Sequence, residues 1–396
     1  MSKRFIAALG LSLALGATPA AHSHYIFAWM TETRAPEAGW YVPGKMGHDA
    51  LAVFDASPGP SFGDLVSFLP VQGAARMAHH TNYELPSDNV LYANDWLAGR
   101  TFVFDLNDAH HPRIVRSFGA AGSYSYPHTF VHLANGDTLA TFQYAGGFNK
   151  RAGGLVEFDP SGKVVRSSSA AAPAIDKNIR PYSLAVSESL DRVVTGSADM
   201  MSAQVSHVAQ VWRLSDLKLL ATIPLPKQTN SDQGKPADSS EPRTLADGKT
   251  IVVPTFDCGL YLVDRLSGSS PSLRRVYDFG SRVCEVPVVA GRYLVMAVES
   301  AHTLVTLDVG DPVHPHEVGH LYLGPNAYPH WIALEPNGSR LVIAGFVSLA
   351  THLRFADIDR ASGRLTLESR EINLTRAWPD GWNGGAVPHG TVFSND

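Results

Sequence analysis

The sequence predicts an all-β protein, a seven-bladed β-propeller whose N- and C-terminal strands close the last blade together. Short stretches of alternating apolar and β-branched residues recur along the chain, and Asn, Asp and Gly separate them at turns. These stretches come in groups of four with a period of about fifty residues, which is typical of β-propellers. The 396 residues include 34 Gly and 26 Pro, enough chain for one large domain rich in turns.

Six of the predicted blades lie inside the chain. The clearest follows His128, where we expect strands at residues 129–137, 138–145, 153–159 and 163–169. Similar groups of four follow His80, Arg180, Glu241, Cys284 and His330, and they cover residues 81–119, 182–225, 242–279, 285–323 and 331–372. The spacing is loose between residues 227 and 240, so a six- or eight-bladed ring is the alternative.

The seventh blade joins the two ends of the chain. We expect a strand in the C-terminal "HGTVFSND" to pair with strands in "DALAVFDA" and "GDLVSFLP" near the N-terminus. Pairing of the two chain ends in one sheet would hold the ring of blades closed. Residues 24–396 are therefore expected to form one propeller domain, with no second domain.

The N-terminus has the pattern of a signal peptide. Lys3 and Arg4 precede an apolar run over residues 5–17, and small residues follow it. We expect cleavage after Ser23 and export of the mature protein, which would be periplasmic or secreted. The apolar run is too short to span a membrane, and no later stretch is long enough, so no transmembrane segment is expected in the mature chain. A short N-terminal membrane anchor is the alternative.

Cleavage after Ser23 would make His24 the first residue. A free amino group beside an imidazole can chelate copper, which favours nitrogen ligands. The alternative is that His22 and His24 only flank the cleavage site.

The overall charge excludes one class of partner. The formal net charge is -5, and only 17% of the residues are charged. No basic stripe is present, so we expect no nucleic-acid binding.

The chain has two cysteines, Cys258 and Cys284. In an exported protein they can form a disulfide, and two buried free thiols are the alternative. Neither lies in a Cys-x-x-Cys or Cys-His pattern, so the sequence does not support a thiol nucleophile.

Histidines stand where the blades begin. Pro-His recurs at His128, His330 and His389, and a His-His pair precedes the blade after His80. The first strand of a propeller blade lines the central channel, so residues at these starts should meet at one mouth. His132 lies four residues after His128, an even step that keeps a strand residue on the same face. The candidate metal ligands are His79, His80, His128, His132, His330 and His389.

Imidazoles without thiolates favour copper, iron or zinc over calcium or magnesium. Glu241 and Glu285, at two other blade starts, could fix the orientation of the ligand rings. The alternative is that these histidines are hydrated in a polar channel. We expect His110, His111, His314, His316 and His320 to be surface residues.

Several segments resemble the selenium-binding protein family, which includes bacterial methanethiol oxidases. The resemblance covers most of the mature chain as a divergent member. The more specific matches are the pair His79-His80, the spacing of His128 and His132, and the C-terminal His389. Two features depart from the family. Family members carry a cysteine shortly after the paired histidines, but "TNYELPSDNVLYAND" has none, so selenium binding through that cysteine is not expected. His330 stands where family members usually have a segment that contains Gly and Pro. The remaining matches are "DALAVFDASPGPSFGDLVSFLP", "RTFVFDLNDAHHPRIVRSF", "HTFVHLANGDTLATF", "GGFNKRAGGLVEFD" and "LVTLDVGDPVHPHEVGHLYLG".

The resemblance implies a seven-bladed propeller and copper-dependent oxidation of a small thiol. In the family's enzymes, methanethiol, oxygen and water become formaldehyde, hydrogen sulfide and hydrogen peroxide. Copper is therefore the expected cofactor, with a small thiol and oxygen as partners; another transition metal bound by histidine is the alternative. The ligands carried over are His79, His80, His128, His132 and His389.

Two other functions stay open. The first is a non-catalytic propeller of the selenium-binding protein type, which binds a metal or a partner. The second is a metal-dependent hydrolase of the lactonase kind, which ranks lower because hard cations prefer oxygen ligands.

Overall fold

The computed structural model describes residues 24–33, 46–73, 77–199, 206–225, 238–336, 338–345, 351–379, 382 and 385–395. The expected signal peptide, residues 1–23, lies outside these residues. The described part of the chain contains β-strands and two short 3-10 helices, η1 (Glu188–Leu190) and η2 (Glu299–Ala301), and no α-helix. Within this part, no helix has the length and apolar character needed to cross a membrane.

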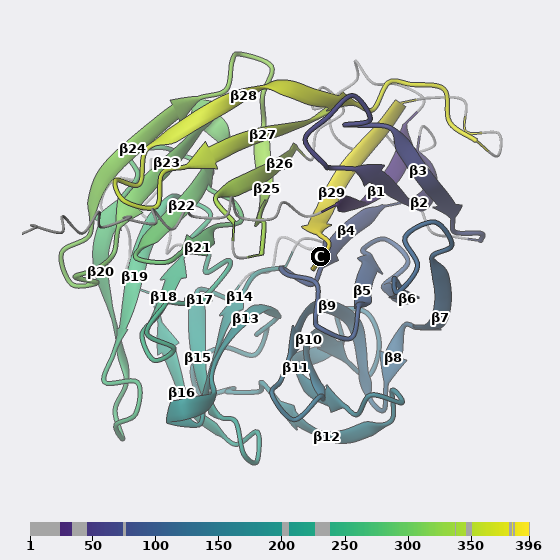
Figure 1. Ribbon diagram of the computed structural model, residues 1–396. Coiled ribbons are helices and arrows are strands. Elements are labelled where there is room, and N and C mark those ends of the chain that lie inside the picture. Colours follow the sequence, from purple (N-terminus) through teal and green to yellow (C-terminus); the bar gives the residue numbers. More distant parts are fainter. Residues whose placement is uncertain are drawn as a thin grey trace, which may run out of the picture.

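The strands form seven sheets around a central axis, and this arrangement confirms the predicted seven-bladed propeller (Figure 1). The first internal blade consists of β4 (Ala78–Thr81), β5 (Val90–Asp95), β6 (Arg100–Asp105) and β7 (Arg113–Phe118). The second consists of β9 (Tyr124–His132), β10 (Thr138–Ala145), β11 (Arg151–Phe158) and β12 (Val164–Ser169), with the short β8 (Ala120–Ala121) beside β9. The third consists of β13 (Pro181–Ser187), β14 (Arg192–Ser197), β15 (Val208–Arg213) and β16 (Leu219–Pro224).

The next three blades have the same order. The fourth consists of β17 (Arg243–Thr244), β18 (Ile251–Pro254), β19 (Gly259–Asp264) and β20 (Ser272–Asp278). The fifth consists of β21 (Val288–Ala290), β22 (Tyr293–Val298), β23 (Thr303–Asp308) and β24 (His316–Tyr322). The sixth consists of β25 (Pro329–Leu334), β26 (Arg340–Gly345), β27 (His352–Ile358) and β28 (Leu365–Asn373). In each blade the first strand is innermost (Figure 1).

The seventh blade joins the chain ends, as predicted. The C-terminal β29 (Gly385–Phe393) is its inner strand and pairs antiparallel with β1 (Tyr25–Thr33). β2 (Met46–Asp55) and β3 (Leu65–Pro70) complete the sheet in the order β29-β1-β2-β3. β1 was not among the strands expected from the sequence, so it supplies the fourth strand that the prediction lacked. Figure 1 shows β29 in yellow beside the purple β1.

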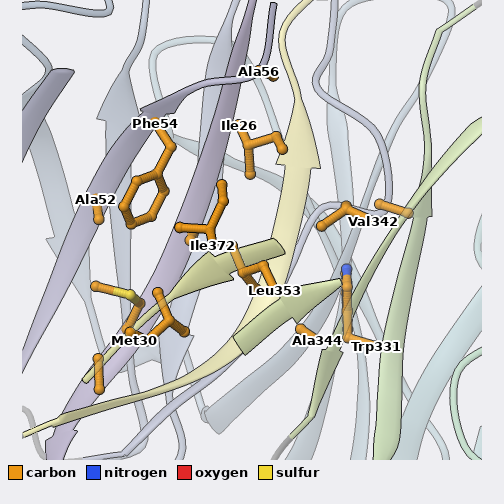
Figure 2. Close-up of a cluster of buried hydrophobic side chains, with 14 of the residues drawn as sticks. Ile26, Met30, Ala52, Phe54, Ala56, Trp331, Val342, Ala344, Leu353 and Ile372 are labelled. Atoms are coloured by element: carbon orange, nitrogen blue, oxygen red, sulfur yellow. The ribbon is translucent and has the colours of Figure 1, made fainter. Parts of the chain in front are cut away.

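Each blade buries both faces against its neighbours. Along β1, the side chains of Ile26 and Met30 pack toward the sixth blade, and Phe27 and Trp29 pack toward the first. The two-residue period of a strand sends alternate side chains to opposite faces, and both faces are apolar here. Figure 2 shows the cluster between the closing blade and the sixth blade, which includes Trp331.

Candidate metal centre

Every blade brings at least one polar side chain to the channel at the start of its inner strand. All of these side chains are buried, with exposed fractions of 8% or less. Backbone geometry at Gly390 lets β29 approach β4 closely, because a Cβ atom there would lie 2.6 Å from the Thr81 side chain. The channel residues are His79 and His80 on β4, His128 on β9, Tyr182 on β13, Glu241 before β17, Glu285 before β21, His330 on β25 and His389 on β29.

β-Bulges in five of the inner strands direct their polar side chains toward the channel. On β4, His79 and His80 together face the single residue Asn94. Consecutive residues of a regular strand point to opposite faces, but an extra residue on one strand breaks this alternation. The two rings stack with centroids 4.4 Å apart and planes inclined by 13°. Similar register shifts occur in four other inner strands, at His128–Thr129, Tyr182–Ser183, His330 and His389–Gly390.

Four imidazoles, which we call the imidazole cluster, converge at the axis: His79, His80, His128 and His389. Their ring centroids are 4.2 Å apart for His80 and His128, and 4.3 Å apart for His79 and His389. One ligand nitrogen from each of His79, His80 and His128 lies within 4.8 Å of the other two. Two nitrogens bound to one metal ion at about 2.1 Å can be at most about 4.2 Å apart. Small ring movements therefore suffice for these nitrogens to share an ion.

His330 belongs to a second group rather than to the imidazole cluster. Its Nδ1 atom lies 3.5 Å from Oε2 of Glu285 and 3.3 Å from Oε2 of Glu299. We call these three residues the carboxylate–histidine group. The His330 ring is nevertheless 4.5 Å from that of His389, so the two groups adjoin.

The structure places His132 apart from the imidazole cluster. The bulge at His128 and Thr129 inserts one residue, so the even spacing no longer keeps His132 on the same face as His128. His132 lies at the edge of the channel instead, where its Nε2 is 3.9 Å from Asp88 and a quarter of its side chain is exposed. Among the described residues it is not part of a metal-binding group.

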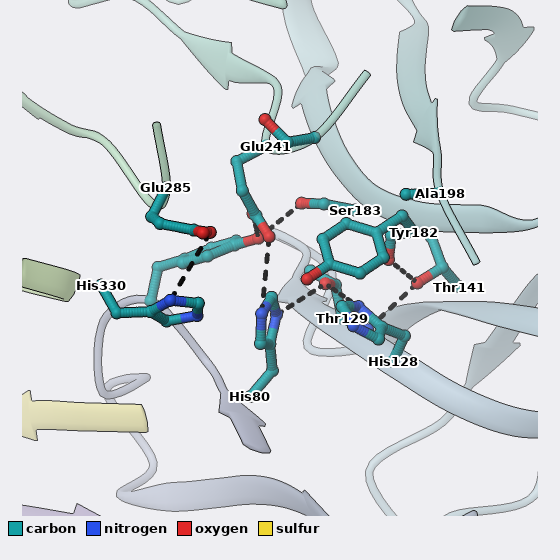
Figure 3. A network of polar contacts seen from close by, with 12 residues as sticks. His80, His128, Thr129, Thr141, Tyr182, Ser183, Ala198, Glu241, Glu285 and His330 are labelled. Carbon is teal, nitrogen blue, oxygen red and sulfur yellow. Dashed lines mark hydrogen bonds and ion pairs between the residues drawn. The ribbon is translucent and has the colours of Figure 1, made fainter. Parts of the chain in front are cut away.

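A polar network fixes the orientation of two cluster rings (Figure 3). The Thr129 hydroxyl lies 3.3 Å from Nδ1 of His80 and 3.1 Å from Nδ1 of His128. On the other side of the first ring, Nε2 of His80 lies 3.5 Å from Oε1 of Glu241. Glu241 therefore contacts a candidate ligand, and Glu285 contacts His330 in the same way.

Glu241 is itself held in place by Tyr83 and Arg243, and Ser183 supports Tyr83. The Tyr83 hydroxyl donates to its Oε2 atom, and Nη1 of Arg243 lies 3.3 Å from the same oxygen. The Ser183 hydroxyl is 2.5 Å from that of Tyr83. The Arg243 guanidinium also stacks on the Tyr83 ring at 3.7 Å. This arrangement compensates the buried carboxylate charge.

A cavity of about 530 Å³ lies further along the channel, beyond this network. Tyr83 and Arg243 line it, together with His132 and apolar residues from the inner strands such as Phe130 and Leu184. The Tyr83–Arg243 pair therefore contacts the cavity on one side and the Glu241 network on the other.

Burial keeps the imidazole cluster neutral. It lowers the pKa of His128 to about 3, against a usual value of 6.5. It also lowers the pKa values of His79, His80 and His389 well below that value, and neighbouring histidines add to the effect. Neutral imidazole is the form that binds a metal ion.

The carboxylate–histidine group behaves differently. Burial lowers the pKa of His330, but the charges of Glu285 and Glu299 raise it above its usual value overall. Burial raises the pKa of Glu285 to about 8, although His330 acts in the opposite direction.

The imidazole cluster fits a transition metal. Nε2 of His128 is buried and has no hydrogen-bond partner among the described residues. A buried nitrogen with a free lone pair carries a desolvation cost that a metal ion would remove. All-nitrogen donors suit copper, zinc or iron.

The other predicted residues lie away from both groups. His24 is exposed directly before β1, and the histidines expected at the surface are exposed, namely His110, His111, His314, His316 and His320. Cys258 and Cys284 form a disulfide, which ties the hairpin between β18 and β19 to the segment before β21. Glu285 directly follows the second cysteine.

Four further residues of the site were not predicted from the sequence, namely Tyr182, Glu299, Tyr83 and Arg243. Tyr182 follows Pro181 as His128 follows Pro127, so the Pro-x pattern could have identified it. Its ring lies 3.9 Å from that of His128. Glu299 begins η2 after the second strand of its blade, and no motif marks that position.

No family model matches the chain, and no curated protein sequence matches it. Solved structures do match. A hypothetical selenium-binding protein from Sulfolobus tokodaii has a TM-score of 0.70 at 12% identity, over 95% of this chain and 94% of that one. The Pseudomonas aeruginosa periplasmic gluconolactonase has a TM-score of 0.62 at 13% identity, over 92% and 98%. A putative 6-phosphogluconolactonase from Bacteroides fragilis has a TM-score of 0.57 at 13% identity, over 96% and 100%. At these identities the similarity shows the fold alone: the chain is a β-propeller, distantly related to these proteins.

Proposed function

We propose that the protein is an exported copper-dependent oxidoreductase, which oxidises a small thiol such as methanethiol with oxygen at the imidazole cluster. The observation that carries the proposal is the convergence of four buried, neutral imidazoles from three blades on the propeller axis. The resemblance to the selenium-binding protein family supports copper and a thiol, and the Sulfolobus neighbour carries that family's name.

The roles of the chain's residues follow from their contacts. His79, His80, His128 and His389 would hold the ion, which would supply one-electron chemistry between a thiol and oxygen. Thr129 and Glu241 keep the rings of His80 and His128 oriented. The ring of Tyr182 packs against that of His128 and would cover one side of this ligand.

The surroundings of the cluster favour a small, weakly polar substrate. Trp331 lies 5.1 Å from His80 and Trp96 lies 5.8 Å from His79, measured between ring centroids. A thiol of one or two carbons loses little hydration in such a site, whereas a sugar-like substrate would lose many hydrogen bonds.

The gluconolactonase neighbours raise hydrolysis as another function. Lactonase-type metal sites rely on oxygen ligands for a hard cation. The imidazole cluster offers only nitrogen, so it supports redox chemistry better than lactone hydrolysis.

Export is supported by the position of the first strand. β1 begins at Tyr25, so removal of residues 1–23 leaves every described strand intact. Mass spectrometry of protein isolated from its own host should give a mature N-terminus at His24. A full-length chain in the cytoplasm would contradict the export proposal.

The activity test measures oxygen uptake by the copper-loaded protein with methanethiol. We expect formaldehyde, hydrogen sulfide and hydrogen peroxide in equal amounts, one of each per oxygen consumed. The His128→Ala variant should lose the activity, and His316→Ala, at an exposed position, should retain it. A protein that binds copper fully but consumes no oxygen would instead be a non-catalytic metal-binding propeller.

A further inference from the structure

We infer that Glu285, Glu299 and His330 form a second metal site, which takes a divalent cation that accepts both oxygen and nitrogen ligands, such as Zn²⁺ or Mn²⁺. This inference goes beyond the proposed function, because it concerns a different ion at a different set of residues. The two groups lie side by side at the channel, and Figure 3 shows His330 facing Glu285 while His80 faces Glu241.

The separations within the carboxylate–histidine group match those of metal ligands. Nδ1 of His330 lies 3.3 Å from one carboxylate oxygen and 3.5 Å from the other, and all three ligand atoms lie within 4.8 Å of one another. Tetrahedral ligands at about 2.1 Å from an ion stand about 3.4 Å apart. Charge-assisted hydrogen bonds are shorter, at about 2.7–2.9 Å. The spacing therefore suits a shared ion better than direct ion pairs.

The charge of the group also calls for a cation. Two carboxylates face one imidazole, and Nδ1 can donate a hydrogen bond to only one carboxylate at a time. Glu285 and His330 are buried, with exposed fractions of 8% and 5%, so two carboxylate charges beside one imidazole are unfavourable there until a cation binds. The Glu299 side chain is one-fifth exposed, which gives an ion an approach from solvent.

Backbone hydrogen bonds and the disulfide hold Glu285 and His330 in place before any ion binds. The Glu285 amide donates to the Ala297 carbonyl at 2.9 Å, and the Val286 amide donates to the His330 carbonyl at 3.0 Å. The second bond crosses from the fifth blade to the sixth. The disulfide at Cys284 restrains the same segment. A site built on restrained strands loses less entropy when it binds an ion.

The ligand types select the ion. Mixed carboxylate and imidazole ligands suit zinc, manganese and iron(II), whereas the all-imidazole cluster is a poor site for manganese. Manganese is therefore the probe that separates the two sites, and zinc is the probe that should occupy both.

The experiment titrates the metal-free full chain with Zn²⁺ and, separately, with Mn²⁺. We expect two equivalents of zinc in the wild type, and one equivalent in both Glu299→Gln and His128→Ala. Manganese, followed by electron paramagnetic resonance, should bind one equivalent in the wild type and in His128→Ala. Glu299→Gln should weaken manganese binding at least about 100-fold. Because Glu299 is partly exposed, this variant carries less risk of misfolding than Glu285→Gln.

The matched control is Glu317→Gln. Glu317 lies 3.4 Å from Nδ1 of His320, almost the same separation, but both side chains are exposed. This variant should bind both metals like the wild type. The inference is overturned if Glu299→Gln retains full zinc and manganese, or if the wild type binds one zinc that only His128→Ala removes. The second result would leave the proposed copper site standing. If only Glu299→Gln lost zinc, the second metal site would be supported and the proposed copper site would be contradicted.

Discussion

Nε2 of His80 lies 3.5 Å from Oε1 of Glu241, and both side chains are almost completely buried. The same carboxylate accepts a hydrogen bond from Tyr83 and pairs with Arg243. Glu241 therefore connects the imidazole cluster to the residues that line the channel cavity, and its charge orients a candidate metal ligand.

Replacing Glu241 by Gln should weaken metal binding at the imidazole cluster by about 10- to 100-fold, because partners of metal-binding histidines typically have effects of this size. The variant should also lose about 1–2 kcal/mol of unfolding free energy, because Tyr83 and Arg243 would then donate to a neutral amide oxygen instead of a carboxylate. Competition with a chelator measures the first effect and urea denaturation the second. Glu317→Gln serves as the control, and unchanged metal affinity in Glu241→Gln would show that the contact does not orient the ring.

The second prediction separates the histidines that bind the metal from histidines that do not contact the cluster. His128→Ala and His389→Ala should each remove bound copper while the propeller stays folded, because neighbouring strands hold β9 and β29 in place. His132→Ala and His316→Ala should retain copper, since neither side chain reaches the cluster. Elemental analysis gives the metal content and circular dichroism the fold. Full copper in both His128→Ala and His389→Ala would rule out the axial site.

The third prediction concerns acid stability of the metal-free protein. In the folded state the cluster histidines have pKa values well below 6.5, and that of His128 is lowered to about 3, because burial disfavours their charged form. In the unfolded chain they titrate near 6.5. Below that pH the unfolded chain binds more protons, so the free energy of unfolding should fall as the pH falls toward 3.

Each histidine contributes up to about 1.4 kcal/mol per pH unit to this slope. The raised pKa of His330 has the opposite sign, so the clearest readout is a difference between variants. His128→Asn should reduce the slope between pH 6 and pH 5 by up to that amount, as measured by urea denaturation. An identical slope in the variant and the wild type would mean that His128 is protonated in the folded state.

The fourth prediction concerns the disulfide between Cys258 and Cys284, which are 26 residues apart. Replacing both cysteines by Ser should lower the unfolding free energy by about 3 kcal/mol, because the unfolded chain gains freedom. Alkylation of the unfolded wild type without reductant should label neither cysteine. Labelling of both would show that the native protein contains free thiols.

The sequence predicted the fold well because the evidence for it was repeated. Each blade carries the same alternation of apolar strands and turns, so an error in one strand, such as the unexpected β1, does not change the architecture. The Pro-His pattern found three of the four blade starts that carry histidine, because proline favours an extended strand entry. The His-His pair marked the fourth.

The contacts within the site were harder to predict. They depend on β-bulges, which change the face that a residue occupies, and on how far each side chain extends into the channel. Even spacing placed His132 beside His128, but the bulge on β9 changed the face. His330 shares the Pro-His pattern, yet Glu285 and Glu299 surround it instead of the other imidazoles. Glu299 comes from a 3-10 turn that no local pattern connects to the channel.

The location of His389 on β29 has a consequence for the order of assembly. A ribosome makes all strands of the six internal blades before it makes His389, and those blades can begin to fold while the cluster still lacks one imidazole. The final pairing of β29 with β1 closes the ring and delivers that imidazole in the same event. An ion held by all four imidazoles can therefore bind only after the ring has closed. The bound ion would then link β29 to the inner strands of two other blades and so oppose reopening of the ring.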